Sequence, residues 1–161
     1  MAEENTTQSS DQTESSTTKP AAKAEPKAKA KKEKPPKIED KPFGEFMEQH
    51  FVPELSKALK EEGWEYVELT FKKAPLAVKG ASAEEDYWQV QGDRPIDIDQ
   101  QFNIVFSKED IKGPKFFYYT QGNSPSSTVE QFMGDERRIT LGLMVLYTVQ
   151  RLNGQKWLAR N

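Results

Sequence analysis

The sequence contains no cysteine among its 161 residues. Disulfide bonds, zinc–thiolate sites, iron–sulfur clusters and cysteine nucleophiles are therefore excluded. His50 is the only histidine, which also excludes a histidine-rich metal site and a pair of catalytic histidines. The absence of cysteine is compatible with a reducing cytosol.

The sequence also lacks an apolar segment of membrane-spanning length. The longest apolar stretch, from Ile139 to Val149, would cross about half of the hydrocarbon core, and it predicts a buried helix. The first residues contain no apolar core of a signal peptide, and their acidic side chains fit a chloroplast transit peptide poorly. We therefore expect a cytoplasmic protein.

Aromatic residues are missing from residues 1–41, whose only large apolar side chains are Met1 and Ile38. Such a segment buries too little apolar surface to offset an ordering cost of about 1–2 kcal/mol per residue. We predict a disordered tail over residues 1–41 and a single domain over residues 42–161. That domain holds every Phe, Tyr and Trp, and its length is sufficient for one hydrophobic core.

Charge is divided unequally along the chain, although the net charge is only −3. Residues 19–37 hold eight lysines and two glutamates, whereas residues 42–161 hold fourteen basic and eighteen acidic residues. An acidic domain argues against nucleic acid as a partner, because phosphate contacts need clustered cations. The lysine-rich segment is either a solubilising tether or a peripheral attachment to an anionic membrane surface or acidic partner.

Apolar residues at helical spacing predict a first helix after Asp40, whose carboxylate is placed to cap it. Pro42 suits the first helical turn, and Gly63 suits the position just after the helix. Pro53 removes a backbone donor inside this segment, so we expect a kink or a break near Phe51.

Alternating apolar and polar residues then predict strands at 66–71, 87–91 and 101–107, with a turn at Gly92–Pro95. A fourth strand is predicted at 115–120, after the break at Gly113–Pro114, and the spacings suit an antiparallel meander. Residues 128–133 are expected to form a short helical turn. Asp135 is expected to cap a final helix over residues 136–153, which Gly154 ends. Because the apolar residues of this helix cover more than one face, it must be covered by the sheet and the first helix or by another protein. The predicted fold is α+β in two layers: a helix, a four-stranded antiparallel meander and a C-terminal helix.

No group of residues in the sequence points to catalysis. His50 would need an orienting carboxylate to act as a general base, and Glu54 is the only local candidate. The acidic groups Glu84–Asp86, Asp97 and Asp99 lack the spacing of a calcium loop, which favours solvated charge over a metal site. Phosphate-binding glycine loops and nucleophile-elbow motifs are absent. We predict a protein that is not an enzyme, with no metal and no cofactor.

Candidate interaction residues lie in Phe116–Tyr119 and at the C-terminus. On a strand, two rings of the aromatic run point to each face, so one pair meets the core and the other meets solvent or a partner, unless helices hide both faces. The C-terminal segment either folds back to pack Trp157 on the core or presents Trp157 and Arg160 to a partner. The predicted partner-binding residues are Phe117, Tyr119, Lys115, Arg137, Trp157 and Arg160.

Seven segments, taken in order, carry a family resemblance. They are Lys41–Phe46, Leu69–Phe71, Tyr87–Val90, Gln101–Ile104, Glu109–Lys115, Asp135–Leu141 and Gln150–Asn161. Through them, residues 41–161 resemble a small family of uncharacterised cyanobacterial and chloroplast proteins. That family is associated with the V subunit of the photosynthetic NADH-dehydrogenase-like complex. Tyr87 stands where the family often has a cysteine, which removes any role for a thiol at that position.

The resemblance implies a non-catalytic peripheral subunit that stabilises the soluble arm of that complex near its ferredoxin-docking site. The complex passes electrons from reduced ferredoxin to plastoquinone, and such a subunit would carry no redox centre. It would contact other subunits on the cytoplasmic side of the thylakoid membrane. The alternative is a transient assembly factor for a photosynthetic membrane complex.

Overall fold

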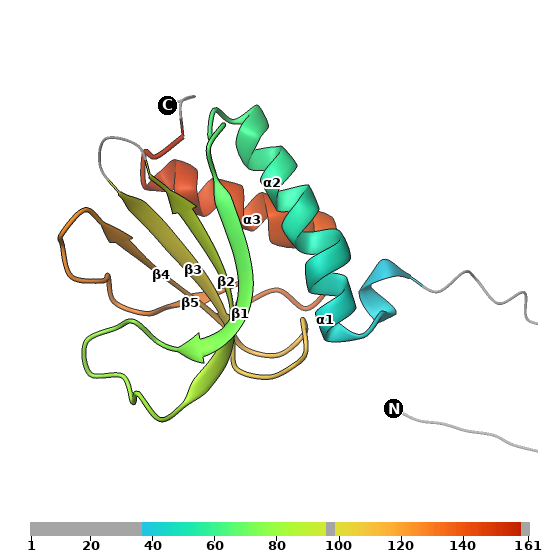
Figure 1. Cartoon of the computed structure of the whole chain (residues 1–161). Coiled ribbons are helices and arrows are strands. Elements are labelled where there is room, and N and C mark those ends of the chain that lie inside the picture. The colour runs from blue at the N-terminus through green and yellow to red at the C-terminus, as the bar shows by residue number, and fades with distance from the viewer. Residues whose placement is uncertain (1–36, 96–98, 159–161) are drawn as a thin grey trace, which may run out of the picture. The chain divides into compact units, whose positions relative to one another are not determined.

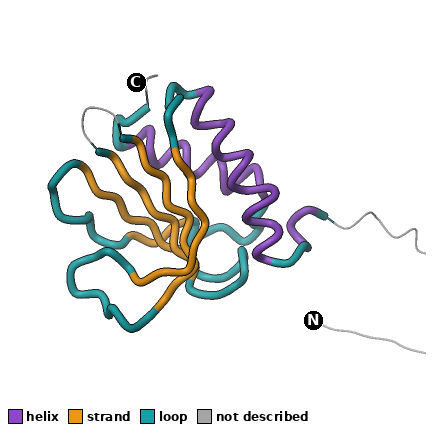
Figure 2. The backbone as a smooth tube through the Cα atoms, in the orientation of Figure 1, coloured by secondary structure: helices purple, strands orange, loops and turns teal. Residues whose placement is uncertain are grey.

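The computed structural model describes residues 37–95 and 99–158, so the predicted tail up to residue 36 lies outside the described residues. The elements, in chain order, are η1 (Ile38–Asp40), α1 (Phe43–Phe46), η2 (Met47–Phe51), α2 (Val52–Glu61), β1 (Glu68–Pro75), β2 (Asp86–Arg94), β3 (Gln100–Phe106), β4 (Lys115–Gln121), β5 (Glu130–Phe132) and α3 (Leu141–Gly154). The strands form one antiparallel sheet in the order β1-β2-β3-β4-β5. Helices α2 and α3 cover one face of this sheet (Figures 1 and 2). The predicted α+β class is confirmed, with five strands rather than four.

The first helical segment runs through α1, η2 and α2 without a gap. Within it, Met47–Phe51 form a π-helical turn, and the N–H of Val52 donates to the carbonyl of Met47. Pro53 has no N–H to donate, and the wider turn just before it accommodates the missing donor. The disturbance expected near Phe51 is therefore present as a change in hydrogen bonding, not as a break.

The sequence predicted the end of this helical segment correctly, but not the residue that caps its start. Gly63 ends it as expected, with a φ of 94°, and the N–H of Trp64 donates to the carbonyl of Leu59 over 2.8 Å. Asp40, in contrast, does not cap the helix, because it belongs to the short 3-10 turn η1. Pro42 takes the N-cap position with no side-chain bond to the helix.

The folded part begins before Pro42, the predicted start of the domain. Glu39 lies in η1, and its Oε1 accepts a hydrogen bond from the N–H of Leu141 over 3.2 Å. A carboxylate satisfies an otherwise free N–H at the start of α3 and interacts favourably with the helix dipole. Residues 38–41 therefore belong to the folded unit and not to the tail.

The alternating apolar residues of the strands face α2 and α3. Val90, Phe102, Ile104, Phe106, Phe117 and Phe132 are buried there, with Leu69 and Phe71 packed beside them. Gly92 belongs to β2, where the sequence predicted a turn. An added Cβ at this position would lie 2.2 Å from the ring of Phe102, its neighbour on β3, so only glycine fits.

The helical turn predicted for residues 128–133 is wrong, because Glu130–Phe132 form strand β5. This strand pairs with β4, placing Glu130 opposite Phe117 and Phe132 opposite Lys115. The ring of Phe132 lies 6.0 Å from that of Phe117, between their centroids. Pairing with the preceding strand β4 and burial of one aromatic ring thus decide the local conformation.

Helix α3 begins at Leu141, five residues after the predicted start. Thr140 is the N-cap, and its hydroxyl accepts a hydrogen bond from the N–H of Leu143 over 3.3 Å. Ile139 and Met144 are both buried, at the two positions of a hydrophobic staple. Asp135, the predicted cap, is exposed and lies outside the helix.

The face of the sheet without helices carries a buried polar network. Tyr118 is 1% exposed, and its hydroxyl donates to Gln89 Oε1 over 3.0 Å while accepting from the N–H of Ala77. The Gln89 amide donates in turn to the carbonyls of Ala74 and Pro75. The β1–β2 connection is therefore tied to β4, and Tyr118 is hidden without a helix above it. Neither prediction for the aromatic run described this arrangement.

The C-terminal segment folds back onto the core. Trp157 is 6% exposed, and its ring stacks on that of Trp64 with 5.9 Å between centroids and an interplanar angle of 21°. Trp64 Nε1 donates to the carbonyl of Trp157 over 2.9 Å. Tyr119 on β4 meets the Trp157 ring edge-on, at 5.4 Å. The segment after α3 is thus part of the hydrophobic core.

We expect Trp157→Ala to lower the free energy of unfolding by about 3–5 kcal/mol, because it leaves a cavity beside Trp64. Urea denaturation followed by circular dichroism measures this change. Gln150→Ala, at an exposed position of α3, is the control and should change stability by about 0.5 kcal/mol or less. Equal losses in the two variants would contradict the packing described for Trp157.

Candidate functional site

Three of the six predicted partner-binding residues lie inside the fold. Phe117 is 1% exposed, Lys115 is 2% exposed and Trp157 is 6% exposed. This placement corrects the expectation that they are surface anchors, and the folded-back alternative for Trp157 is the right one. Of the others, Tyr119 is half-buried, Arg137 is exposed, and Arg160 lies outside the described residues.

Arg151, which was not among the predicted partner-binding residues, contacts Glu130 on β5 and two rings of the aromatic run on β4. Its Nε donates to Glu130 Oε2 over 3.0 Å, and its Nη2 donates to Glu130 Oε1. The guanidinium also lies 5.1 Å from the ring centroid of Phe117 and 5.6 Å from that of Tyr119. The hydrogen bonds to Glu130 raise the pKa of Arg151. This forked contact fixes α3 against β4 and β5.

Lys115 shapes the β3–β4 connection. Its Nζ donates to the carbonyl of Ile111 over 2.8 Å and to that of Gly113 over 3.0 Å. Burial lowers the pKa of Lys115, while the nearby carboxylate of Asp110 acts in the opposite direction. The two carbonyls hold a buried cation in place, so this lysine has a structural role in the described fold.

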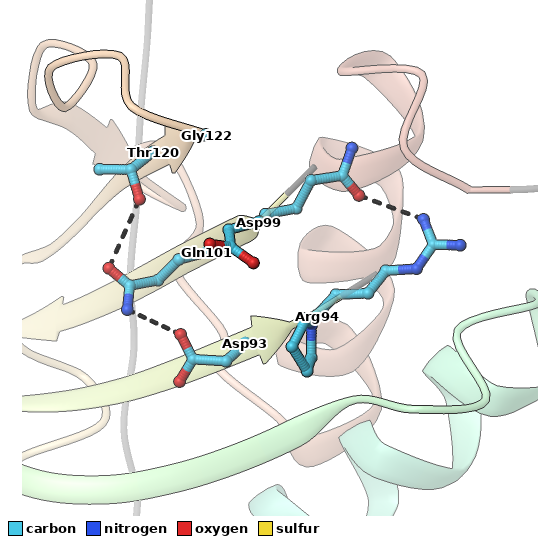
Figure 3. A pocket seen from close by; sticks show the side chains of 8 residues that line it. Asp93, Arg94, Asp99, Gln101, Thr120 and Gly122 are labelled. Carbon is cyan, nitrogen blue, oxygen red and sulfur yellow. Dashed lines mark hydrogen bonds between the residues drawn. The ribbon is translucent and has the colours of Figure 1, made fainter. Parts of the chain in front are cut away.

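A polar pocket of about 280 Å³ lies at the β2–β3 end of the sheet (Figure 3). Both carboxylate oxygens of Asp93 accept hydrogen bonds, from Gln91 Nε2 and from Gln101 Nε2, each over 2.7 Å. Arg94 donates to Gln100 Oε1 over 3.1 Å on the other side of the pocket. An acid whose two oxygens are occupied by neighbouring amides is not placed to act as a general base.

The candidate acid–base and metal residues are not brought together. His50 is half-buried beside Phe46, and its Nε2 has no hydrogen-bond partner among the described residues. Glu54 is exposed and forms no described bond with His50. Within residues 37–95 and 99–158, no three His, Asp or Glu side chains lie close enough together to hold a metal ion. Asp97 lies outside these ranges.

The outer face of α3 is an uncharged, partly apolar surface. We use this name for Gly142, Leu143, Leu146, Val149 and Gln150. Leu146 is 47% exposed, Gly142 and Gln150 are exposed, and the other two are partly buried. No charged residue occurs between Leu141 and Gln150, although 30% of the whole chain is charged. The excess apolarity that the sequence predicted for this helix is therefore only partly covered by the fold.

The other side of α3 holds the helix firmly on the sheet. Met144, Val145, Thr148 and Leu152 are buried, and the Thr148 hydroxyl donates to the carbonyl of Met144 over 2.8 Å. None of the described helices combines the length and the apolar character that crossing a membrane requires. The outer face of α3 is thus a rigid, uncharged surface on a well-anchored helix.

Lys115 gives the stability of the domain a specific dependence on pH. Because its pKa in the fold lies below the ordinary value of 10.5, the unfolded state binds this proton more tightly than the folded state. The destabilising cost is present in full below the folded pKa and disappears as the pH rises towards 10.5. We therefore expect the wild type to gain stability relative to Lys115→Met over this rise. Urea unfolding at stepped pH measures the difference.

Lys112→Met is the matched control, since Lys112 is exposed on the same connection. Its stability should follow the pH profile of the wild type. Parallel profiles for Lys115→Met and the wild type would show that Lys115 titrates alike in the folded and unfolded chains.

Comparison with known sequences gives the family of this chain. No curated protein matches it. Residues 37–159 match a family described as a protein of unknown function (DUF2996). The match takes in every helix and strand of the described fold, from η1 to α3, and most of the chain. This chain therefore belongs to the DUF2996 family of proteins of unknown function.

Proposed function

We propose that this protein is a non-catalytic peripheral subunit of a photosynthetic membrane complex, and that the outer face of α3 binds a neighbouring subunit. The observation that carries the proposal is the exposure of Leu146 within a helix segment that has no charged residue. Interface centres are depleted of charge, and their apolar side chains leave water when the partner binds.

The chemistry of this face favours a protein partner. Leu143, Leu146 and Val149 supply apolar contact area, and no charge has to be desolvated when they are covered. Gly142 has open space around its Cα, which lets a partner side chain approach the helix backbone closely. Arg151 and the buried residues of α3 hold the face in one position before binding, which reduces the entropy lost on association.

The choice of complex rests on the sequence resemblance of residues 41–161. On that basis we assign the protein to the photosynthetic NADH-dehydrogenase-like complex, where it stabilises the soluble arm near the ferredoxin-docking site. It would act on the cytoplasmic side of the thylakoid membrane. The lysines of residues 19–37 would add attraction to anionic lipid headgroups. The protein would need no cofactor for this role.

We expect the tagged full chain to recover subunits of this complex, in a near-fixed ratio, from gently solubilised cyanobacterial thylakoids. Leu146→Glu should lower that recovery by about ten-fold or more, because the partner would bury an unpaired carboxylate. Mass spectrometry of the captured proteins measures both the partners and their ratio.

Val129→Glu is the control for this experiment. Val129 is also an exposed apolar residue, 40% exposed, but it lies in the β4–β5 connection. Its recovery of partners should match that of the wild type, and an equal loss in both variants would argue against the outer face of α3. Capture of assembly intermediates at variable ratios would contradict a permanent subunit and favour the transient assembly factor.

A further inference from the structure

Strand β1 is a long edge of the sheet, and no other strand of the described residues pairs with its outer side. It spans Glu68–Pro75 and pairs only with β2. Among the described residues, no backbone hydrogen bond joins β1 to a strand or loop other than β2. Figure 1 shows β1 at the front of the sheet, with no other ribbon passing over it. Every second residue of such an edge turns its N–H and C=O outward, where another strand can pair with them.

The side chains of β1 alternate in charge and polarity along this edge. Glu68, Thr70 and Lys72 are exposed and occupy the face without helices. Leu69 and Phe71 are partly buried on the face that α2 covers. One acidic and one basic residue therefore stand at equal distances on either side of Thr70.

We propose that two copies of this chain join their β1 strands antiparallel, about a two-fold axis at Thr70, to form one continuous sheet. In this register Thr70 lies opposite the partner's Thr70, and Glu68 lies opposite the partner's Lys72. The symmetry repeats the Glu–Lys pair on the other side of the axis. On the helix face, Leu69 lies opposite the partner's Phe71. Directly opposed unlike charges and apolar pairs stabilise neighbouring strands.

Charge complementarity selects this register over the others. A shift of the pairing register by one residue would turn the helix face of one copy to the opposite side of the joined sheet. The helices of both copies therefore stay on one side only in registers that oppose residues whose side chains lie on the same face. Among such registers, only the one centred on Thr70 opposes Glu68 and Lys72 within β1. A centre two residues towards either end, at Glu68 or Lys72, opposes two like charges.

The features that usually protect an edge strand do not block this pairing. Lysine and proline commonly prevent another strand from joining an edge. Lys73, however, folds back over its own sheet, with Nζ 5.8 Å from the centroid of the Trp88 ring. Pro75 lies beyond the segment Glu68–Lys72 that this register pairs within β1.

This inference goes beyond the proposed function, because it uses neither the outer face of α3 nor any other subunit. No residue of α3 takes part in the pairing of the two β1 strands. A negative result in the dimer experiment below would therefore not contradict the proposed binding of a membrane complex. A failure to capture that complex would likewise not contradict the dimer.

Sedimentation equilibrium of the full chain, over a range of concentrations at low salt, tests the pairing. The wild type should show a monomer–dimer equilibrium. Glu68→Lys and Lys72→Glu, each alone, should raise the dimer dissociation constant by about ten-fold or more, because each places like charges opposite one another twice. The double variant Glu68→Lys/Lys72→Glu exchanges the charges and should restore the dissociation constant of the wild type.

Lys79→Glu and Glu84→Lys make the same changes in net charge on the β1–β2 loop, and they should leave the dimer unchanged. A wild type that stays monomeric overturns the proposal. So does a double variant as weak as the single ones, or a control that weakens the dimer equally, since net charge would then explain the loss. Thermal unfolding of each variant shows that these exposed substitutions leave the fold intact.

The absence of cysteine allows an independent geometric test. Thr70→Cys places one thiol per copy at the proposed axis, where opposed Cβ atoms of about 4.5–5.5 Å separation come within reach of a disulfide. Mild oxidation should therefore give a covalent dimer rapidly. Ala83→Cys, exposed on the β1–β2 loop, should cross-link much more slowly, and equal rates for the two variants would overturn the register.

Discussion

The contact between Trp64 and Trp157 is the interaction on which the arrangement of helices over the sheet depends. Trp64 follows α2 in the chain, and Trp157 follows α3, so their stacked rings join the C-terminal ends of both helices. The buried indole N–H of Trp64 needs an acceptor, and the carbonyl of Trp157 supplies it. Trp64 also contacts Phe102 on β3, with 6.0 Å between ring centroids. One aromatic junction therefore connects α2, α3 and the sheet.

This junction determines which surfaces remain for partners. Trp157 and Phe117, two of the predicted partner-binding residues, are buried inside the domain and are not available on its surface. Arg151 is likewise engaged with Glu130 and with the rings of Phe117 and Tyr119. Within the described residues, the fold leaves available an uncharged helix face, on α3, and an unpaired backbone edge, on β1.

The sequence predicted those parts of the fold that depend on local periodicity. Strands β1 to β3 alternate apolar and polar residues over most of their length, and Gly63 ends the first helix with a positive φ. Strand β5 was missed because three residues are too few to show a period, and only its pairing with β4 makes it a strand. The start of α3 was misplaced because Asp135 and Thr140 both have capping side chains, and their tertiary surroundings decide between them.

The site was harder to predict than the fold, because burial of a charged or aromatic residue is a tertiary property. Lys115 follows a segment with several exposed charged residues, yet its ammonium group is buried and donates to two loop carbonyls. The unusual apolarity of α3 was readable from the sequence, but the side that stays uncovered was not. The spacing of the strands, in contrast, predicted an antiparallel meander, which places β1 at one edge, and the observed order of β1 to β4 confirms it.

The open face of the sheet, which no described helix covers, is less suited to binding another chain than the outer edge of β1. On it Tyr118 and Gln89 bond to each other and to the β1–β2 connection, so their polar groups are already satisfied within the chain. A partner placed on this face would have to compete with those bonds. The outer backbone groups of β1 have no such internal bonds among the described residues. A strand added there forms new hydrogen bonds without breaking existing ones, which is why the edge is the more favourable place for association.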